Sequence, residues 1–110
     1  MGIDIGKNNK MKISVYKSKS SISIKLGNDY LELNISELKF EDIEKFKNIE
    51  EYKWENRNSI KAGKTLDSDV FWSFQEGRVT ILIGQDDECW EVGINISLEL
   101  LSNIIKQCEN

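Results

Sequence analysis

Residues 70–97 read VFWSFQEGRVTILIGQDDECWEVGINIS, and this stretch decides the fold. Three segments, 70–74, 79–83 and 89–94, are rich in the aromatic and β-branched residues that favour strands. Glu76-Gly77 and residues 84–88 separate the segments, and both interruptions carry typical turn residues. The pattern therefore predicts three consecutive antiparallel strands joined by short turns.

The first half of the chain follows a similar plan. Apolar and polar residues alternate over 11–16, 22–26 and 30–35, which predicts three more strands because strand side chains alternate between two faces. A helix is predicted over 38–54, capped by Ser36, and a second helix follows Ser97. The apolar residues of these helices are Phe40, Ile43, Phe46 and Ile49 in the first, and Leu98, Leu100, Leu101, Ile104 and Ile105 in the second.

Each half joins its last strand to its helix through Asn-Ile-Ser, at 34–36 and 95–97. This indicates either a pseudo-repeat of three strands and a helix, or a shared type of junction. The length of 110 residues suits one domain. We expect a single α+β domain over residues 1–110, with about six antiparallel strands and two helices on one face of the sheet. Residues 1–9 are expected to be a flexible N-terminus, and 55–68 a polar connector between the halves.

The strand pattern also assigns side chains to the two faces of the sheet. The residues expected to face the helices are Val79, Ile81, Ile83, Trp90, Val92 and Ile94. Those expected on the opposite face are Phe71, Leu82 and Cys89. Trp72 is also expected in the core. The opposite face is therefore more apolar than a solvated face needs, which indicates that it is covered or used for a partner.

Several chemistries are excluded. The chain has no histidine, which removes every mechanism that uses an imidazole. Ala62-Gly63-Lys64-Thr65 resembles part of a phosphate-binding loop, but position 58 is Asn where the motif needs Gly. Asp86-Asp87-Glu88, followed by Glu91, is open to three interpretations: a solvated turn, an acidic patch for a partner, or a metal site. The spacing of a calcium loop is absent. We expect no enzymatic activity, no cofactor and no metal.

The charge is unevenly distributed along the chain. Residues 1–25 hold six lysines and one acid, whereas residues 67–110 hold nine acids against Arg78 and Lys106. An acidic surface repels nucleic-acid phosphates and attracts a basic protein. We therefore expect a protein partner and no nucleic acid. The expected partner-binding residues are Glu76, Asp86, Asp87, Glu88 and Glu91, with Trp54 or Phe71 as an apolar anchor.

The start of the sequence lacks the features of a signal peptide, and no apolar run approaches the length of a membrane span. We expect a cytoplasmic protein without a membrane partner, in which Cys89 and Cys108 are reduced and buried. The abundance of Lys, Ile and Asn is typical of AT-rich bacterial or phage genomes.

The size, acidity and strand–helix layout, with Asp86-Asp87-Glu88 on a hairpin, resemble small acidic bacterial immunity proteins, including those of contact-dependent growth inhibition systems. The resemblance implies a tight one-to-one complex with a basic toxin domain, often a nuclease, whose cleft an acidic surface can block. Two other interpretations stay open. One is a phage-encoded inhibitor of a host defence nuclease. The other is a structural or oligomerising module that pairs through the apolar second face of the sheet.

Overall fold

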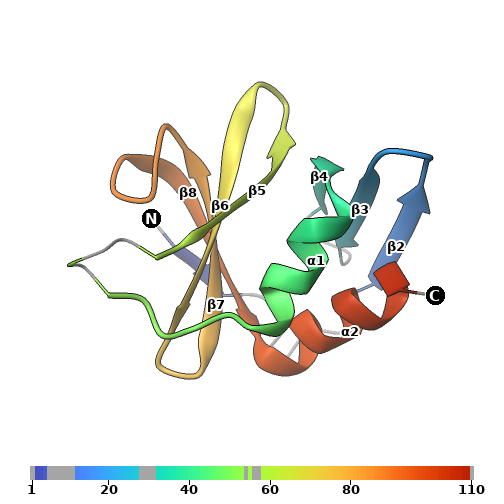
Figure 1. Cartoon of the computed structure of the whole chain (residues 1–110). Helices are drawn as coiled ribbons and strands as arrows, with labels where there is room; N and C mark the ends of the chain where they lie inside the picture. The colour runs from blue at the N-terminus through green and yellow to red at the C-terminus, as the bar shows by residue number, and fades with distance from the viewer. Residues whose placement is uncertain (1, 5–11, 28–31, 54, 56–57, 110) are drawn as a thin grey trace.

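The computed structural model describes residues 2–4, 12–27, 32–53, 55 and 58–109 (Figure 1). The elements in these ranges are β1 (Gly2–Asp4), β2 (Lys12–Lys17), β3 (Ile22–Gly27), β4 (Glu32–Leu38), α1 (Phe40–Lys47), β5 (Ile60–Thr65), β6 (Ser68–Gln75), β7 (Arg78–Gly84), β8 (Trp90–Ser97) and α2 (Leu98–Glu109). The α+β class predicted from the sequence is confirmed.

The strands form one sheet in the order β1-β8-β7-β6-β5-β4-β3-β2. Strands β2 to β8 are antiparallel and follow one another in chain order, while β1 pairs with β8 in parallel. The described residues thus contain seven antiparallel strands rather than six, and the additional one, β5, lies inside the expected connector 55–68. Residues 2–4 of the expected flexible N-terminus form β1, and the rest of that segment lies outside the described residues.

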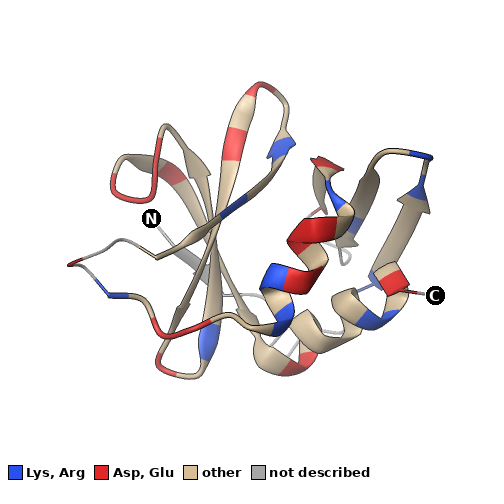
Figure 2. Ribbon diagram, viewed as in Figure 1, with Lys and Arg blue, Asp and Glu red and all other residues tan. Residues whose placement is uncertain are grey.

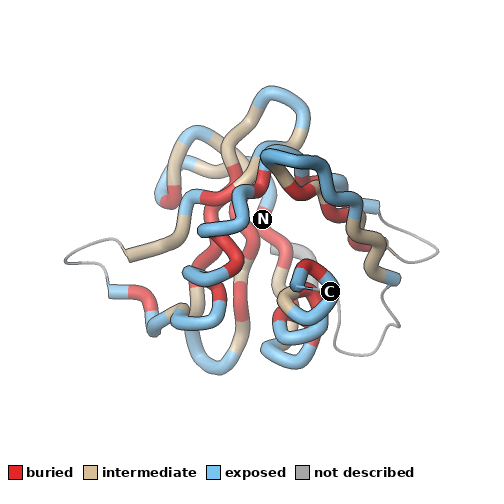
Figure 3. Tube along the Cα trace, turned by 45° about the vertical axis from the view of Figure 1, so that its right-hand side comes forward, coloured by how far each residue is buried: buried red, intermediate tan, exposed pale blue. Residues whose placement is uncertain are grey.

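The sheet bends around a layer of two helices (Figure 1). Helix α2 contacts β2 at one edge of the sheet and also β7 and β8 near the other edge, while α1 contacts α2 and β5. One helix can contact strands so far apart in the sheet order only if the sheet is strongly curved. The buried residues lie where the strands and helices face each other (Figure 3).

The core contains residues of β3 and β4, of β5 to β8, and of both helices. Ile43 and Phe46 of α1 pack in it with Leu101, Ile104 and Cys108 of α2. Trp72 of β6 is completely buried, as expected, and its ring centroid lies 4.5 Å from that of Phe46. Its indole Nε1–H donates a hydrogen bond of 3.0 Å to the Ala62 carbonyl of β5. The polar end of this large side chain is therefore satisfied inside the core.

Helix α1 is shorter than the predicted 38–54. Asn48 ends it, with a backbone conformation of φ −115° and ψ 26° and a side-chain hydrogen bond to the Glu44 carbonyl. The chain then runs to β6, where the Tyr52 N–H donates to the Phe74 carbonyl at 2.7 Å. The Tyr52 N–H, which a longer helix would have used, is thus bonded to the sheet instead. Ile49 continues the apolar spacing but packs on the core from outside the helix.

The two Asn-Ile-Ser junctions differ in structure. The Ser97 hydroxyl accepts the Leu100 N–H at 3.1 Å and caps α2, as predicted. Ser36 does not cap α1, because its hydroxyl donates to the Lys64 carbonyl of β5 at 3.3 Å. The start of α1 is held instead by the Asp42 carboxylate, which accepts the Lys39 N–H at 2.9 Å. The described elements run as four strands and a helix twice rather than three strands and a helix, and the halves differ because β1 pairs in parallel with β8 while β5 lies between β4 and β6. The unlike junctions distinguish the halves further.

An ion pair and a buried thiol lie where the two helices approach each other. Lys47 of α1 pairs with Glu109 of α2 and with Glu44, and these two carboxylates, Glu109 first, raise the pKa of Lys47. Cys108 is buried and its burial raises the pKa of the thiol. Both cysteines are free, but Cys89 is exposed, so the expectation of two buried thiols is wrong for Cys89.

Candidate functional site

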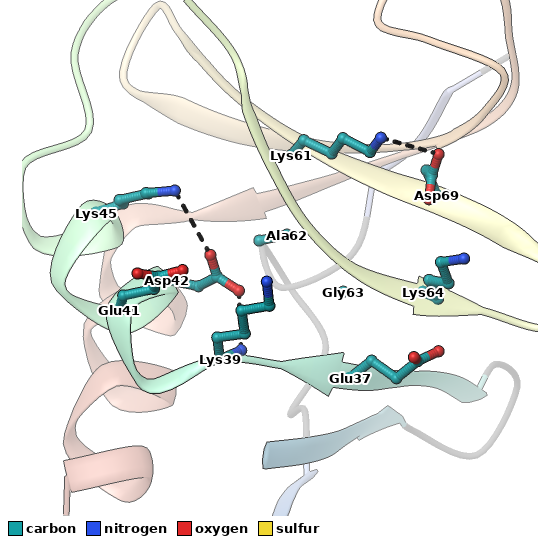
Figure 4. Close-up of a pocket in the computed structure, with 10 residues that line it drawn as sticks. All are labelled: Glu37, Lys39, Glu41, Asp42, Lys45, Lys61, Ala62, Gly63, Lys64 and Asp69. Carbon is teal, nitrogen blue, oxygen red and sulfur yellow. Dashed lines mark hydrogen bonds and ion pairs between the residues drawn. The ribbon is translucent and has the colours of Figure 1, made fainter. Parts of the chain in front are cut away.

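A cleft of about 370 Å³ opens where β4 meets β5 (Figure 4). The strands are joined there by one register pair, Ser36 with Lys64. Gly63 has φ 84°, and a Cβ at this position would lie 2.5 Å from Cγ2 of Ile35. Residue 63 must therefore be glycine because β5 passes so close to β4. This accounts for the glycine of Ala62-Gly63-Lys64-Thr65 without a phosphate.

The charges around this cleft balance. Its lysines are Lys39, Lys45, Lys61 and Lys64. Its acids are Glu37, Glu41, Asp42 and Asp69. Lys45 lies 3.8 Å from Asp42, and Lys61 lies 3.4 Å from Asp69 (Figure 4). Four lysines against four acids select neither an anion nor a cation, so the cleft does not indicate a class of ligand.

The segment 85–89 between β7 and β8, here called the acidic turn, has a fixed internal structure. The Gln85 N–H donates to the Cys89 carbonyl at 2.9 Å. Oδ1 of Asp86 accepts the N–H groups of Glu88 at 2.8 Å and of Cys89 at 2.6 Å. An Asp side chain that bonds the backbone ahead of it stabilises a turn locally. Asp86 is therefore a structural residue of the turn.

Asp87 is buried, with 8% of its surface exposed. Its Oδ2 accepts the Ser59 hydroxyl at 2.7 Å and the Tyr52 hydroxyl at 3.3 Å. Both donors come from the chain between α1 and β5. Asp87 thus connects the acidic turn to a segment distant in sequence. One interpretation of the sequence was a solvated turn, but Asp87 is not solvated.

Glu88 and Glu91 are exposed at this end of the β7–β8 hairpin. Together with Asp86 and Asp87 they place four carboxylates within six residues. The sequence has no lysine or arginine between Arg78 and Lys106, so the rest of β7 after Arg78, the acidic turn and β8 contribute no positive charge. Figure 2 shows acidic residues in the β7–β8 turn and basic residues at the β2–β3 turn, on the other side of the molecule.

Trp90 lies on the opposite face from the one expected. The register shifts at the start of β8, where Ile83 pairs with Val92 but Gly84 pairs with Trp90. This bulge moves Trp90 to the outer face of the sheet, which is the face away from the helices. A Cβ on Gly93 would lie 2.9 Å from Cζ3 of Trp90, so the indole lies over that glycine. Val92, also expected inside, is 36% exposed, whereas Val79, Ile81 and Ile94 are buried as expected.

A pocket of about 310 Å³ lies on the outer face beside Trp90 and is here called the outer-face pocket. Residues of the sheet that line it are Ser73, Gln75, Thr80, Leu82 and Asn95. Tyr52, Asp87 and Trp90 complete its wall. Its described lining carries one carboxylate and no cation.

Several polar groups of the outer-face pocket have no partner within the described part of the chain. Ser73 is 5% exposed, yet its hydroxyl makes no hydrogen bond there. The Gln75 amide and the Trp90 indole N–H also have no partner among the described residues. Oδ1 of Asn95 accepts the Thr80 hydroxyl at 2.7 Å, and the amide NH₂ of Asn95 has no partner among the described residues. No side-chain nitrogen or oxygen atom of the described residues is both buried and without a hydrogen-bond partner, so these polar groups face the open pocket.

The structure brings together only some of the sequence-predicted site residues. Asp86, Asp87, Glu88 and Glu91 lie at one end of the β7–β8 hairpin. Glu76 lies in the β6–β7 turn, at the far end of β7, and seven strand residues at about 3.3 Å each separate the two turns by roughly 20 Å. Phe71 is on the outer face as expected, but it is only 8% exposed. Trp54 lies outside the described residues.

Tyr52, Ser59 and the polar lining of the outer-face pocket were not among the predicted site residues. The Asp87 hydrogen bonds join residues 35 and 28 positions apart, and no local pattern signals such contacts. The alternation of Ser73 and Gln75 with Trp72 and Phe74 does carry a signal, because it places polar groups together on one face.

Within the described ranges, no group of three or more acidic or cysteine side chains is arranged to hold a metal ion. None of the described helices has the length and apolar character needed to cross a membrane. No family model, curated protein or solved structure matches the chain significantly.

Proposed function

We propose that this chain is a non-enzymatic, protein-binding inhibitor, an immunity protein that neutralises a basic toxin domain such as a nuclease in the cytoplasm. The observation that carries the proposal is the acidic turn with the adjoining strands. Asp86 and Asp87 bond to the protein itself, so the exposed Glu88 and Glu91 are held on a fixed backbone. A fixed acidic surface that exposes Glu88 and Glu91 suits the positive cleft that a nuclease needs for phosphate.

An oligomerising module and an enzyme gain less support. A module that pairs through an apolar outer face needs exposed apolar area there, but Phe71 and Leu82 are 8% and 6% exposed. The chain contains no histidine, and its described residues assemble no metal site. These observations favour a binding role over a catalytic one.

The experiment is affinity capture from the native host with three immobilised forms of the chain: the wild type, Glu88→Lys with Glu91→Lys, and the control Glu41→Lys with Glu99→Lys. The control makes the same change of charge at exposed residues of α1 and α2. We expect the wild type and the control to retain one basic protein in a one-to-one complex. The Glu88/Glu91 variant should lose it.

The captured protein is then purified, and its association is measured at low and at physiological salt. Steering by exposed charges should give a fast association that slows as salt rises, because the screening length falls to about 8 Å at 0.15 M. The captured protein should be toxic when expressed alone and harmless when expressed with this chain. An acidic partner, or equal capture by the Glu88/Glu91 variant, would contradict the proposal.

A further inference from the structure

We propose that Leu66, at the tip of the β5–β6 hairpin, is the apolar anchor that inserts into a socket on the basic protein partner. The inference rests on the proposed function, because it names a contact residue for the same partner. The sequence offered Trp54 or Phe71 as the anchor, but Phe71 is 8% exposed and Trp54 lies outside the described residues.

The Leu66 side chain is almost completely exposed. Its exposed fraction is 97%, whereas the other exposed large apolar residues of the described chain range from 36% to 60%. Single apolar residues are common on protein surfaces, so exposure alone assigns no role. It does mean that the leucine side chain contributes no burial to folding.

The backbone at this position also favours a different residue. Thr65 pairs with Ser68, so Leu66 and Asp67 form a two-residue turn, and Leu66 has φ 54°. Side chains in this left-handed region cost free energy that glycine avoids. A turn with positive φ at its first central residue accordingly prefers glycine there. Folding would therefore be served better by glycine at 66, both in conformation and in hydration.

A strained residue that folding does not need points to a function. Glu37 and Glu76 also have positive φ, but their side chains are polar and are hydrated readily. Among the described residues, Leu66 is thus the one that combines a positive φ with an exposed apolar side chain. Binding, rather than folding, accounts for a leucine at this position.

The hairpin tip lies beside the acidic turn. Asp69 of β6 pairs with Gly84 of β7, so the β5–β6 turn and the acidic turn leave the sheet at one end, while the β6–β7 turn lies at the other (Figure 1). Leu66 precedes Asp69 by three residues, and residues 85–89 follow Gly84 directly. Strand spacings of about 3.3 Å per residue and about 4.8 Å between strands place Leu66 roughly 10–15 Å from the acidic turn. A partner surface of about 800 Å² can cover both.

The charges near Leu66 indicate which partner fits. Asp67 follows it in the turn, Glu91 lies at the same end of the sheet, and both are exposed. A second copy joined through the same tip would bring Asp67 against its counterpart, and a surface of anionic lipid would repel both acids. A protein with an apolar socket bordered by lysine or arginine suits the leucine and the acids together.

Burial of one leucine side chain is enough to make Leu66 a main contributor to affinity. Its transfer from water into a socket strengthens binding roughly 10- to 100-fold. The strand pairing of Thr65 with Ser68 orders the turn before the partner arrives, which lowers the cost of binding.

The first test measures stability in the purified chain. The Tm of Leu66→Gly should rise by about 3 °C because the strain is relieved, and Glu76→Gly, the matched control at the other end of the sheet, should behave alike. Leu66→Met keeps an apolar side chain of similar size and the strain, so its Tm should not change. A lower Tm for Leu66→Gly would show that the leucine serves the fold and would overturn the proposal.

The second test finds what the tip touches. A photoreactive p-benzoylphenylalanine is placed at Asp67, which leaves Leu66 in place, or at Glu76 as the control, and the chains are irradiated in the native host. We expect an adduct with one basic protein from position 67 and none from position 76. No adduct from position 67, or an adduct with a second copy of the chain, would overturn the proposal.

The third test measures the affinity of the purified adduct protein for each variant. Leu66→Gly should bind at least about tenfold more weakly, mainly through faster dissociation, whereas Leu66→Met and Glu76→Gly should bind as the wild type does. The Glu88→Lys, Glu91→Lys chain should instead associate more slowly, because exposed charges act on the encounter. Equal affinity of Leu66→Gly and the wild type would refute the role of Leu66.

The outcomes separate this inference from the proposed function. If the adduct protein needs Leu66 for binding but is not toxic, the anchor stands and the immunity function fails. If a basic toxin is captured and binds Leu66→Gly as tightly as the wild type, the function stands and the anchor fails.

Discussion

Asp87→Ala should destabilise the fold far more than its place in an acidic turn would suggest. The substitution removes the acceptor of the Ser59 and Tyr52 hydroxyl groups, and Asp87 is 8% exposed. A hydrogen bond to a charged group contributes about 1.5–3 kcal/mol. The two bonds share one oxygen and are not additive, so we expect a loss of about 3 kcal/mol in the free energy of unfolding.

That loss is a large part of the roughly 5–15 kcal/mol that stabilises a domain of this kind. At about 4 °C per kcal/mol for a domain near 100 residues, the Tm should fall by about 12 °C. Urea unfolding followed by tryptophan fluorescence, and thermal unfolding followed by circular dichroism, would both measure the change. Asp87→Asn keeps an acceptor oxygen and should lose about 1 kcal/mol.

Glu88→Ala is the matched control, because Glu88 is exposed in the same turn and surface substitutions usually change stability by less than about 0.5 kcal/mol. A double-mutant cycle of Asp87→Ala with Tyr52→Phe should give a coupling energy above about 0.5 kcal/mol. If Asp87→Ala and Glu88→Ala unfold at the same midpoint, or if the cycle gives no coupling, the structural role assigned to Asp87 is refuted.

The remaining predictions concern the β6–β7 turn and the two thiols. Glu76 and Gly77 have φ values of 52° and 76°, which are typical of the two-residue turn in which Asn-Gly is preferred. Glu76→Asn should therefore raise the free energy of unfolding by about 0.5–1 kcal/mol without changing partner association. A loss of stability or of association would contradict this. A thiol reagent should label exposed Cys89 in the native protein and Cys108 only with unfolding, and rapid native labelling of both would count against the burial of Cys108. Burial raises the pKa of Cys108, so the folded state keeps its proton where the unfolded state loses it, and stability should fall as pH rises through the unfolded pKa. Urea midpoints above pH 8 should therefore decline less in Cys108→Ala than in the wild type, and parallel declines would be evidence against this linkage.

Local patterns predicted much of the fold. The alternation in β2, β3 and β7 and the serine cap of α2 depend on neighbouring residues, and the structure contains all of them. Strand β5 was missed because Ile60–Thr65 contains a glycine and two lysines, which weaken the strand signal. Its glycine is needed for a close approach to Ile35, and no local pattern signals that contact.

The site was predicted less well, for two physical reasons. A single inserted residue at the start of β8 reverses the face of Trp90, and alternation alone cannot locate such a bulge. The burial of Asp87 depends on Tyr52 and Ser59, which are distant in sequence. The difference in charge between the N-terminal and C-terminal parts of the chain could be predicted, because it depends only on where the charged residues lie in the sequence.

The joint between β4 and β5 has a consequence for the cooperativity of unfolding. One register pair, Ser36 with Lys64, connects these strands, whereas β7 pairs with β8 and β6 along most of their lengths. Backbone hydrogen bonds between β4 and β5 therefore contribute little to the cooperative unfolding of the whole sheet. The helical layer contacts the sheet on both sides of this joint, because α2 packs on β2 of the β2–β4 part and on β8 of the β5–β8 part. Whether the chain melts as one unit or as two is therefore decided by side-chain packing in the helical layer, and loosening α2 would let β2–β4 open as a separate unit while β5–β8 remains folded.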